Sequence, residues 1–210
     1  MEILWSVLIG YALGCISPSA IISKLKHRNL RQEGTGNLGA TNVTMVFGKG
    51  WGVFVMLFDI AKGAAAYLIC HFAFRDAILH AGLIAGLCAM LGHVFPFYLG
   101  FKGGKGLATF GGVALAYNPL LFLILIVSCM VIMLIVNYSY VFPYVGASLF
   151  CIGASLWSLD IYVFLLTLPM AALIIYKHFG NLKKARSAED ITVRDYIKKH
   201  IFGKKSEKAE

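Results

Sequence analysis

Seven apolar runs divide this 210-residue chain, and they restrict its fold more than any other feature. A helix that crosses a bilayer needs about 20 apolar residues, with about 17 as the lower end. The runs cover residues 3–23, 51–74, 77–98, 107–117, 120–136, 144–157 and 161–176. This pattern predicts an all-α, polytopic membrane protein of about seven transmembrane helices. The fourth run is the shortest, so we expect a short or partly re-entrant helix there.

The composition supports this class of protein. Hydrophobic residues make up 59% of the chain and charged residues only 14%, against about 25% charged residues in a typical soluble domain. All five cysteines fall within apolar runs and lack metal-ligand spacing, so we interpret them as small core residues. We therefore expect no metal site and no cofactor. The chain turns apolar at its third residue without a basic segment before it, which predicts a retained helix and not a cleaved signal peptide.

The net charge of +9 is placed beside the apolar runs. Most basic residues lie at 24–49, at 102 and 105, and in the segment 177–208. Cytoplasmic loops of membrane proteins are enriched in Lys and Arg, so these segments are predicted to be cytoplasmic and the N-terminus to be outside. No RNA-binding pattern of aromatic and basic residues is present, and we expect no nucleic acid partner. We expect one transmembrane domain, 1–190, and a basic tail, 191–210, which either lies on anionic lipid as an amphipathic helix or is a solubilising tail.

Three polar segments are predicted to meet at the cytoplasmic face, and the first is residues 34–42. Its three closely spaced glycines let the backbone turn several N–H groups toward one point, which forms an anion-binding nest. Hydroxyl and amide side chains add further donors. The alternative is a plain turn. The candidate phosphate-binding residues are Thr35, Gly36, Asn37, Gly39, Thr41 and Asn42.

The second polar segment, residues 101–109, places two lysines among three glycines at the start of an apolar helix. Positive charge, a flexible backbone and a helix N-terminus together favour a bound anion. The spacing is not that of a nucleotide-binding P-loop. The alternative is two ordinary cytoplasmic lysines beside a turn. The candidates here are Lys102, Gly103, Gly104 and Lys105.

The third polar segment ends the last apolar run. His178 and Asn181 are three residues apart and share one face if the helix continues. Beside two anion-binding loops, His178 is a candidate hydrogen-bond donor or proton carrier, although a histidine at a membrane boundary is often only interfacial. Asp59 and Lys62, three apart within the second run, are interpreted as a structural ion pair in preference to a proton relay. His93 either lines the pocket or, as we prefer, caps the third helix.

These residues together resemble the bacterial acyl-phosphate:glycerol-3-phosphate acyltransferases of the PlsY type, over nearly the whole chain. The resemblance rests on residues 34–42, Asp59 with Lys62, residues 92–96 and 100–109, and His178 with Asn181. It implies seven helices in a bacterial inner membrane and an active site that faces the cytoplasm. The implied reaction moves an acyl chain from acyl phosphate to the 1-hydroxyl of glycerol 3-phosphate, giving lysophosphatidic acid and phosphate for phospholipid synthesis. The implied catalytic residues are Thr35, His178 and Asn181.

The chain departs from the family pattern at four places. Thr35 stands where the family usually has serine, and Met45 stands where an arginine would bind phosphate through two hydrogen bonds. Residues 138–143 replace a small, serine-bearing turn, and residues 188–190 weakly match a Gly-x-Glu element. These changes leave a divergent paralogue open, with another acceptor or with lipid binding and no turnover. A small transporter is a third hypothesis, although we find no internal repeat.

Overall fold

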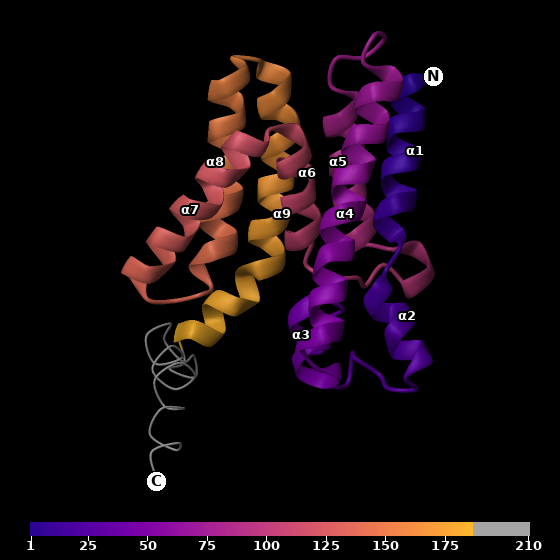
Figure 1. Ribbon diagram of the computed structural model, residues 1–210, viewed down its shortest axis with the longest axis vertical. Coiled ribbons are helices and arrows are strands. Elements are labelled where there is room, and N and C mark those ends of the chain that lie inside the picture. The colour runs from indigo at the N-terminus through magenta and orange to yellow at the C-terminus, as the bar shows by residue number, and fades with distance from the viewer. Residues whose placement is uncertain (187–210) are drawn as a thin grey trace.

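The computed structural model is built from α-helices throughout the part of the chain that it describes, residues 1–186, with side chains through Gly180 (Figure 1). The predicted tail, 191–210, and residues 188–190 lie outside the described residues. The elements are α1 (Glu2–Cys15), α2 (Pro18–Leu25), α3 (Ala40–Phe47), α4 (Lys49–Phe74), α5 (Ala81–Val94), the 3₁₀ helix η1 (Phe97–Leu99), α6 (Leu107–Tyr117), α7 (Pro119–Val136), α8 (Val141–Ser158) and α9 (Ile161–Arg186).

Within the described residues, six helical segments are long and apolar enough to cross a membrane: Glu2–Leu25, Lys49–Phe74, Ala81–Leu99, Pro119–Val136, Val141–Ser158 and Ile161–Gly180. The seventh predicted helix exists as α6, but its 11 residues rise only about 16 Å, roughly half of the hydrocarbon thickness. The all-α membrane class is confirmed. The fourth apolar run forms a short helix and not a full span.

The first span is broken in its middle, which the sequence analysis did not predict. α1 ends at Cys15, and α2 restarts at Pro18, where the missing N–H of proline is tolerated at the first helical position. The hydroxyl of Ser17 caps α2 by accepting from the Ala20 N–H at 3.3 Å. The Cys15 and Ile16 carbonyls, freed by this break, accept from the Tyr98 hydroxyl at 2.8 Å and from the Lys62 ammonium at 2.7 Å.

Small residues let the first helices pack closely. A Cβ on Gly10 or Gly14 of α1 would collide with the backbone of α5 at Ala85 or Ala89. α6 approaches α4 in the same way, because Gly63 has no room beside the Thr109 carbonyl. Such close contacts are typical of helix association in membranes.

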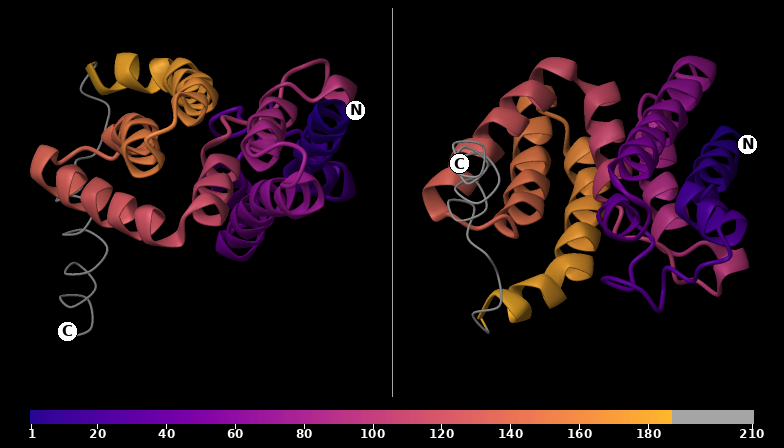
Figure 2. Two further views of the ribbon diagram at one scale, coloured as in Figure 1. Left: turned by 90° about the horizontal axis from the view of Figure 1, so that it is seen from above. Right: turned by 60° about the horizontal axis from the view of Figure 1, so that its bottom comes forward.

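The helices form two groups that α6 joins (Figures 1 and 2). α1, α4 and α5 make one group, and α7, α8 and α9 make the other. The main buried cluster continues across both, with the Phe110 ring of α6 packed edge-on against Phe150 of α8 at 5.2 Å. The outer faces carry many exposed apolar side chains, most of all on α7, as expected for contact with lipid.

The N-terminus and the end of α9 lie at opposite ends of the helix bundle (Figure 1). The segment that joins α2 to α3, the segment that joins α5 to α6, and the end of α9 all lie toward the same end. These are the three polar segments of the sequence analysis, so the fold places them on one side of the bundle.

Candidate active site

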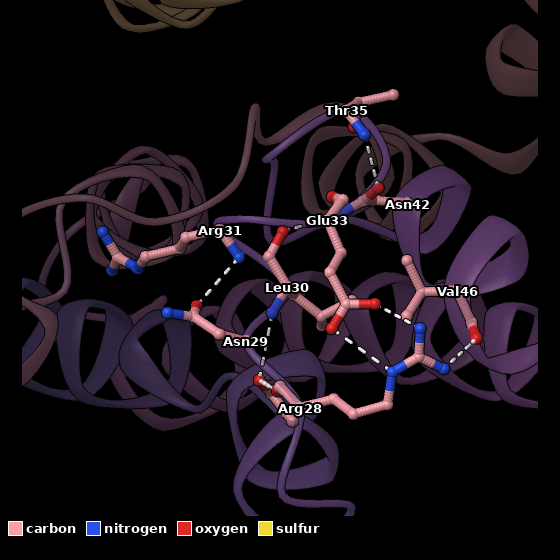
Figure 3. Close-up of polar contacts among 9 residues, drawn as sticks. Arg28, Asn29, Leu30, Arg31, Glu33, Thr35, Asn42 and Val46 are labelled. Atoms are coloured by element: carbon pink, nitrogen blue, oxygen red, sulfur yellow. Dashed lines mark hydrogen bonds and ion pairs between the residues drawn. The ribbon is translucent and has the colours of Figure 1, made fainter.

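The first polar segment is held from within by Asn42, at the start of α3. Its buried side chain accepts from the Thr35 N–H at 2.7 Å and donates to the carbonyls of Leu30 and Glu33 at 2.8 and 3.1 Å (Figure 3). Gly34 has a φ of +59°, and a Cβ there would collide with the Asn42 amide oxygen. The Asn42 amide thus holds the backbone of this loop in its observed conformation.

These bonds change how the first segment is able to bind an anion. The N–H of Thr35 is used by Asn42, and the N–H of Gly36 donates to the Glu33 carbonyl at 3.0 Å. Neither is therefore a nest donor, contrary to the interpretation from sequence. The α3 N-terminus, which begins after Gly39, still has N–H groups that no helical carbonyl accepts. The side chains of Thr35 and Thr41 are exposed beside it, and that of Asn37 is half-buried.

The second polar segment follows α5 and returns against it. Gly103 and Gly104 donate their N–H groups to the carbonyls of Val94 and His93, at 2.9 and 3.1 Å. A Cβ on Gly103 would collide with the His93 carbonyl, and one on Gly104 with the His93 ring. Both glycines are therefore required because the backbone lies directly on α5. Lys105 follows them, half-buried, just before α6 begins.

The two glycine-rich segments contact each other, as predicted. The carbonyl of Leu38 lies 2.9 Å from the place of a Cβ on Gly104 and accepts from the Ser19 hydroxyl at 3.1 Å. The Arg31 guanidinium donates across the junction to the carbonyls of Leu99 and Lys102, at 3.1 and 2.6 Å. The basic residues at 24–49 were interpreted only as cytoplasmic charge, so this contact of Arg31 was not predicted.

A buried polar cluster lies beneath the second segment. The Lys62 ammonium is 2.7 Å from the Asp59 carboxylate and 2.9 Å from Nδ1 of His93, and all three side chains are buried. The predicted ion pair of Asp59 and Lys62 is confirmed. The preferred reading of His93 was wrong, because its ring does not cap α5. It lies between the ion pair and Gly104, so the cluster supports the glycine backbone from below.

The third polar segment brings α9 to the same place. His178 is buried, and its Nδ1 lies 2.8 Å from the Ile174 carbonyl, one turn earlier. Since a carbonyl only accepts, Nδ1 carries the proton, and Nε2 of the neutral ring is an acceptor. Gly106, next to Lys105, lies against α9 at this place, since a Cβ on it would be 3.7 Å from the Ile174 side chain. The Tyr144 hydroxyl fixes this turn by donating to the His178 carbonyl at 2.6 Å.

Not every candidate residue is placed with equal detail. Asn181 lies within α9, but its side chain is outside the described residues. The Lys102 side chain is exposed, while its carbonyl is bound by Arg31. Met45 is 64% exposed on α3, one turn after Thr41, so it faces away from the core. Tyr144 was not predicted as a site residue, because no neighbouring residue in the sequence indicates its hydrogen bond to the distant His178 carbonyl.

Gly104→Ala is expected to lower activity and stability together. The added methyl group must displace the His93 ring or the Leu38 carbonyl, and overpacking of this kind costs about 1–3 kcal/mol. Gly50→Ala is the matched control, because a Cβ there meets nothing within 4 Å. Thermal unfolding and turnover of both purified variants measure the effect. Equal behaviour of the two would contradict the close packing at Gly104.

The geometry defines an integral membrane protein in which two glycine-rich segments, one of them carrying Lys105, meet toward one end of the helix bundle. The model of the family described as glycerol-3-phosphate acyltransferase matches residues 4–188. The chain belongs to this family.

Relatives of this name match the chain along most of its length. The glycerol-3-phosphate acyltransferase of Macrococcus caseolyticus is 37% identical over 196 residues, which are 90% of this chain and 96% of that protein. The one from Pelagibacter ubique is 36% identical and covers 93% of this chain and all of its own.

Two crystal structures of PlsY, an integral membrane glycerol 3-phosphate acyltransferase, resemble this fold. The glycerol 3-phosphate form matches with a TM-score of 0.83 at 33% identity and covers 91% of this chain and 96% of that one. The lysophosphatidic acid form matches with a TM-score of 0.80 at 32% identity. These likenesses favour an acyltransferase over the divergent paralogue without turnover.

Proposed function

We propose that this protein transfers an acyl chain from acyl phosphate to the 1-hydroxyl of glycerol 3-phosphate, giving lysophosphatidic acid and phosphate. One observation carries the proposal: the segment that carries Lys105 lies against the first glycine-rich segment at Leu38 and against α9 at Ile174, one turn before His178. Both substrates are phosphate esters or anhydrides, and a half-buried cation beside helix N-termini suits them. The ligands in the two PlsY structures, glycerol 3-phosphate and lysophosphatidic acid, support the same acceptor and product.

Acyl phosphate is a mixed anhydride, so its phosphate leaves readily. The site must hold two anions close together and aim the hydroxyl oxygen at the acyl carbonyl. The oxygen forms a new bond to the carbonyl carbon, and the tetrahedral intermediate then collapses as its bond to the phosphate oxygen breaks. The Lys105 ammonium and the first turn of α6 stabilise the negative charge during both steps.

The hydroxyl proton has two acceptors within this scheme. Nε2 of neutral His178 is one, because Nδ1–H is fixed on the Ile174 carbonyl. The other is an oxygen of a substrate phosphate. We assign phosphate and hydroxyl contacts to Thr35, Asn37, Thr41, Lys105 and Asn181, with Lys102 at the entrance. Asn42 acts by holding the loop, and so does the backbone at Gly36 and Gly39.

We further propose that this end of the bundle faces the cytoplasm of a bacterial inner membrane, with the N-terminus outside. The segment between α2 and α3, with basic residues at 26–31, and the segment between α5 and α6, with lysines at 102 and 105, both lie toward that end, which agrees with the charge rule. The acyl chain of the donor then lies among the apolar helices while its phosphate reaches the site.

Turnover by the purified protein tests the proposal directly. Acyl phosphate and glycerol 3-phosphate should give phosphate and lysophosphatidic acid in equal amounts, measured by a colorimetric phosphate assay and by mass spectrometry of the lipid. Glycerol serves as the acceptor control, since it has the hydroxyl but no phosphate to bind. Phosphate release without any acylated product, or equal acylation of glycerol, would refute this acceptor.

Met45→Arg is expected to lower the KM for glycerol 3-phosphate about tenfold, because a charge-assisted hydrogen bond contributes about 1.5–3 kcal/mol. Met45 is exposed on α3 beside Thr41, so an arginine there reaches the mouth of the site without repacking the core. Met45→Gln, of similar length and without charge, is the control. An unchanged KM in the arginine variant would show that Met45 lies too far from the acceptor phosphate.

A further inference from the structure

A basic pocket lies beside α2 and is bounded by Leu38 of the first polar segment. It has a volume of about 350 Å³, within the range of small-molecule sites. α2 forms one wall, the turn after α2 forms another, and Leu38 and Leu99 close it toward the glycine-rich segments. Neither Lys105 nor His178 lines this pocket, so it is separate from the site described above.

The side chains that line the pocket favour an anion. Lys24, His27, Arg28 and Arg31 all contribute to the wall, and no described Asp or Glu does. Arg28 is neutralised by its ion pair with Glu33. The side chains of Lys24 and His27 make no hydrogen bond or ion pair with any residue that the structure describes, so their donors are available.

The turn that carries the basic wall is held by its own hydrogen bonds. The Arg28 guanidinium donates to the Glu33 carboxylate and, at 3.0 Å, to the Val46 carbonyl, while Asn29 accepts from the Arg31 N–H at 3.1 Å (Figure 3). The Ser23 hydroxyl donates to the Arg28 carbonyl. These bonds order the turn before any ligand arrives, which reduces the entropy lost on binding.

The two faces of α2 indicate the kind of ligand. Residues Ala20, Ser23 and Lys24 line the basic pocket at helical spacing. Ile21 and Leu25, on the opposite face, line an apolar groove with aromatic side chains of α4. Lipid therefore meets the apolar face, and the basic pocket opens away from it. We propose that this pocket binds the phosphate group of a water-soluble anion, at a site separate from that of Lys105.

The pocket is connected to the active site through one side chain. Arg31 lines the pocket and also donates to the carbonyls of Leu99 and Lys102, which flank the start of the second glycine-rich segment. A phosphate in the pocket competes with those carbonyls for the guanidinium. Occupancy of the pocket thus acts on the backbone that carries Lys105, without direct contact between the two anions.

Site-resolved lysine labelling tests this proposal on the full-length protein in nanodiscs of neutral lipid. A small amine-reactive reagent modifies the lysines, and peptide mass spectrometry reports the rate at Lys24. Inorganic phosphate at ten times its dissociation constant should slow labelling of Lys24 about tenfold by mass action, compared with chloride at equal ionic strength. Exposed Lys49 is the internal control and should react at an unchanged rate.

Three variants and one lipid composition decide the interpretation. Lys105→Ala should keep the protection of Lys24. This result does not depend on acyl transfer, so the pocket and the proposed function are tested separately. His27→Gln and Arg31→Gln should weaken the protection of Lys24. His27 is exposed, so its substitution should leave folding unaffected. Loss of protection in Lys105→Ala would overturn the separate site. Protection that appears only in nanodiscs of anionic lipid, without soluble phosphate, would overturn the water-soluble ligand in favour of a lipid headgroup.

Discussion

Lys105→Ala should lower kcat/KM for acyl transfer at least about 100-fold, the scale on which a single stabilising donor acts in acyl-transfer sites. Lys105 is half-buried and lies directly before the start of α6, where partial exclusion of water strengthens the attraction of its ammonium to phosphate. Because the side chain stabilises charge in both the substrate and the transition state, KM should rise and kcat should fall. Steady-state phosphate release with each substrate varied in turn measures both constants.

The control for this prediction is Lys49→Ala, which removes an exposed lysine at the start of α4, outside both glycine-rich segments. It should leave both constants within about twofold, since screened surface charges contribute little. Lys102→Ala should fall between the two, because its side chain is exposed at the entrance. An equal loss of kcat/KM for Lys49→Ala and Lys105→Ala would mean that overall positive charge attracts the substrates and that Lys105 has no specific role in the site.

Lys62→Met should destabilise the protein by about 3–5 kcal/mol, because it leaves the Asp59 carboxylate buried without its cation. The Ile16 carbonyl at the break of the first span would also lose its donor. A change of this size lowers the midpoint of thermal unfolding by on the order of 10 °C in a chain of this length. Thermal unfolding in detergent measures it.

The double variant Asp59→Asn with Lys62→Met should recover a large part of that loss, since neither charge is then buried alone. The matched control is Arg75→Met, which breaks an exposed pair with Asp76 and should cost less than about 1 kcal/mol. A double variant no more stable than Lys62→Met would show that the cost comes from the lost contacts to Ile16 and His93. The charge on Asp59 would then contribute nothing.

Much of the fold follows from local sequence. Apolar run length predicted the helices, and polar segments within an apolar chain predicted which loops come together. The break at Ser17 and Pro18 was not predicted, because the run from residue 3 to 23 is apolar enough to be read as one helix. Besides the local Ser17 cap, Lys62 and Tyr98 stabilise it by donating to its carbonyls from elements far away in the sequence. Such contacts leave no trace in a window of neighbouring residues.

The sequence predicted which residues form the candidate site but only part of what each residue does there. Glycine in the second segment suggested flexibility, yet Gly103 and Gly104 serve to let the backbone touch α5. Asn42 suggested an anion donor, yet its amide is used by the loop. In both cases a polar or small residue has a binding use and a packing use, and only tertiary structure distinguishes them.

The shortness of α6 has a consequence for where the two substrates meet. α6 rises only about 16 Å, so the segment before it lies deeper in the bundle than the start of a full span would. In the proposed reaction, a water-borne phosphate ester descends to the depth of the acyl carbonyl, and the donor does not have to move its hydrocarbon tail toward water. The acylated product is then released sideways, already within the leaflet where later steps of lipid assembly would find it.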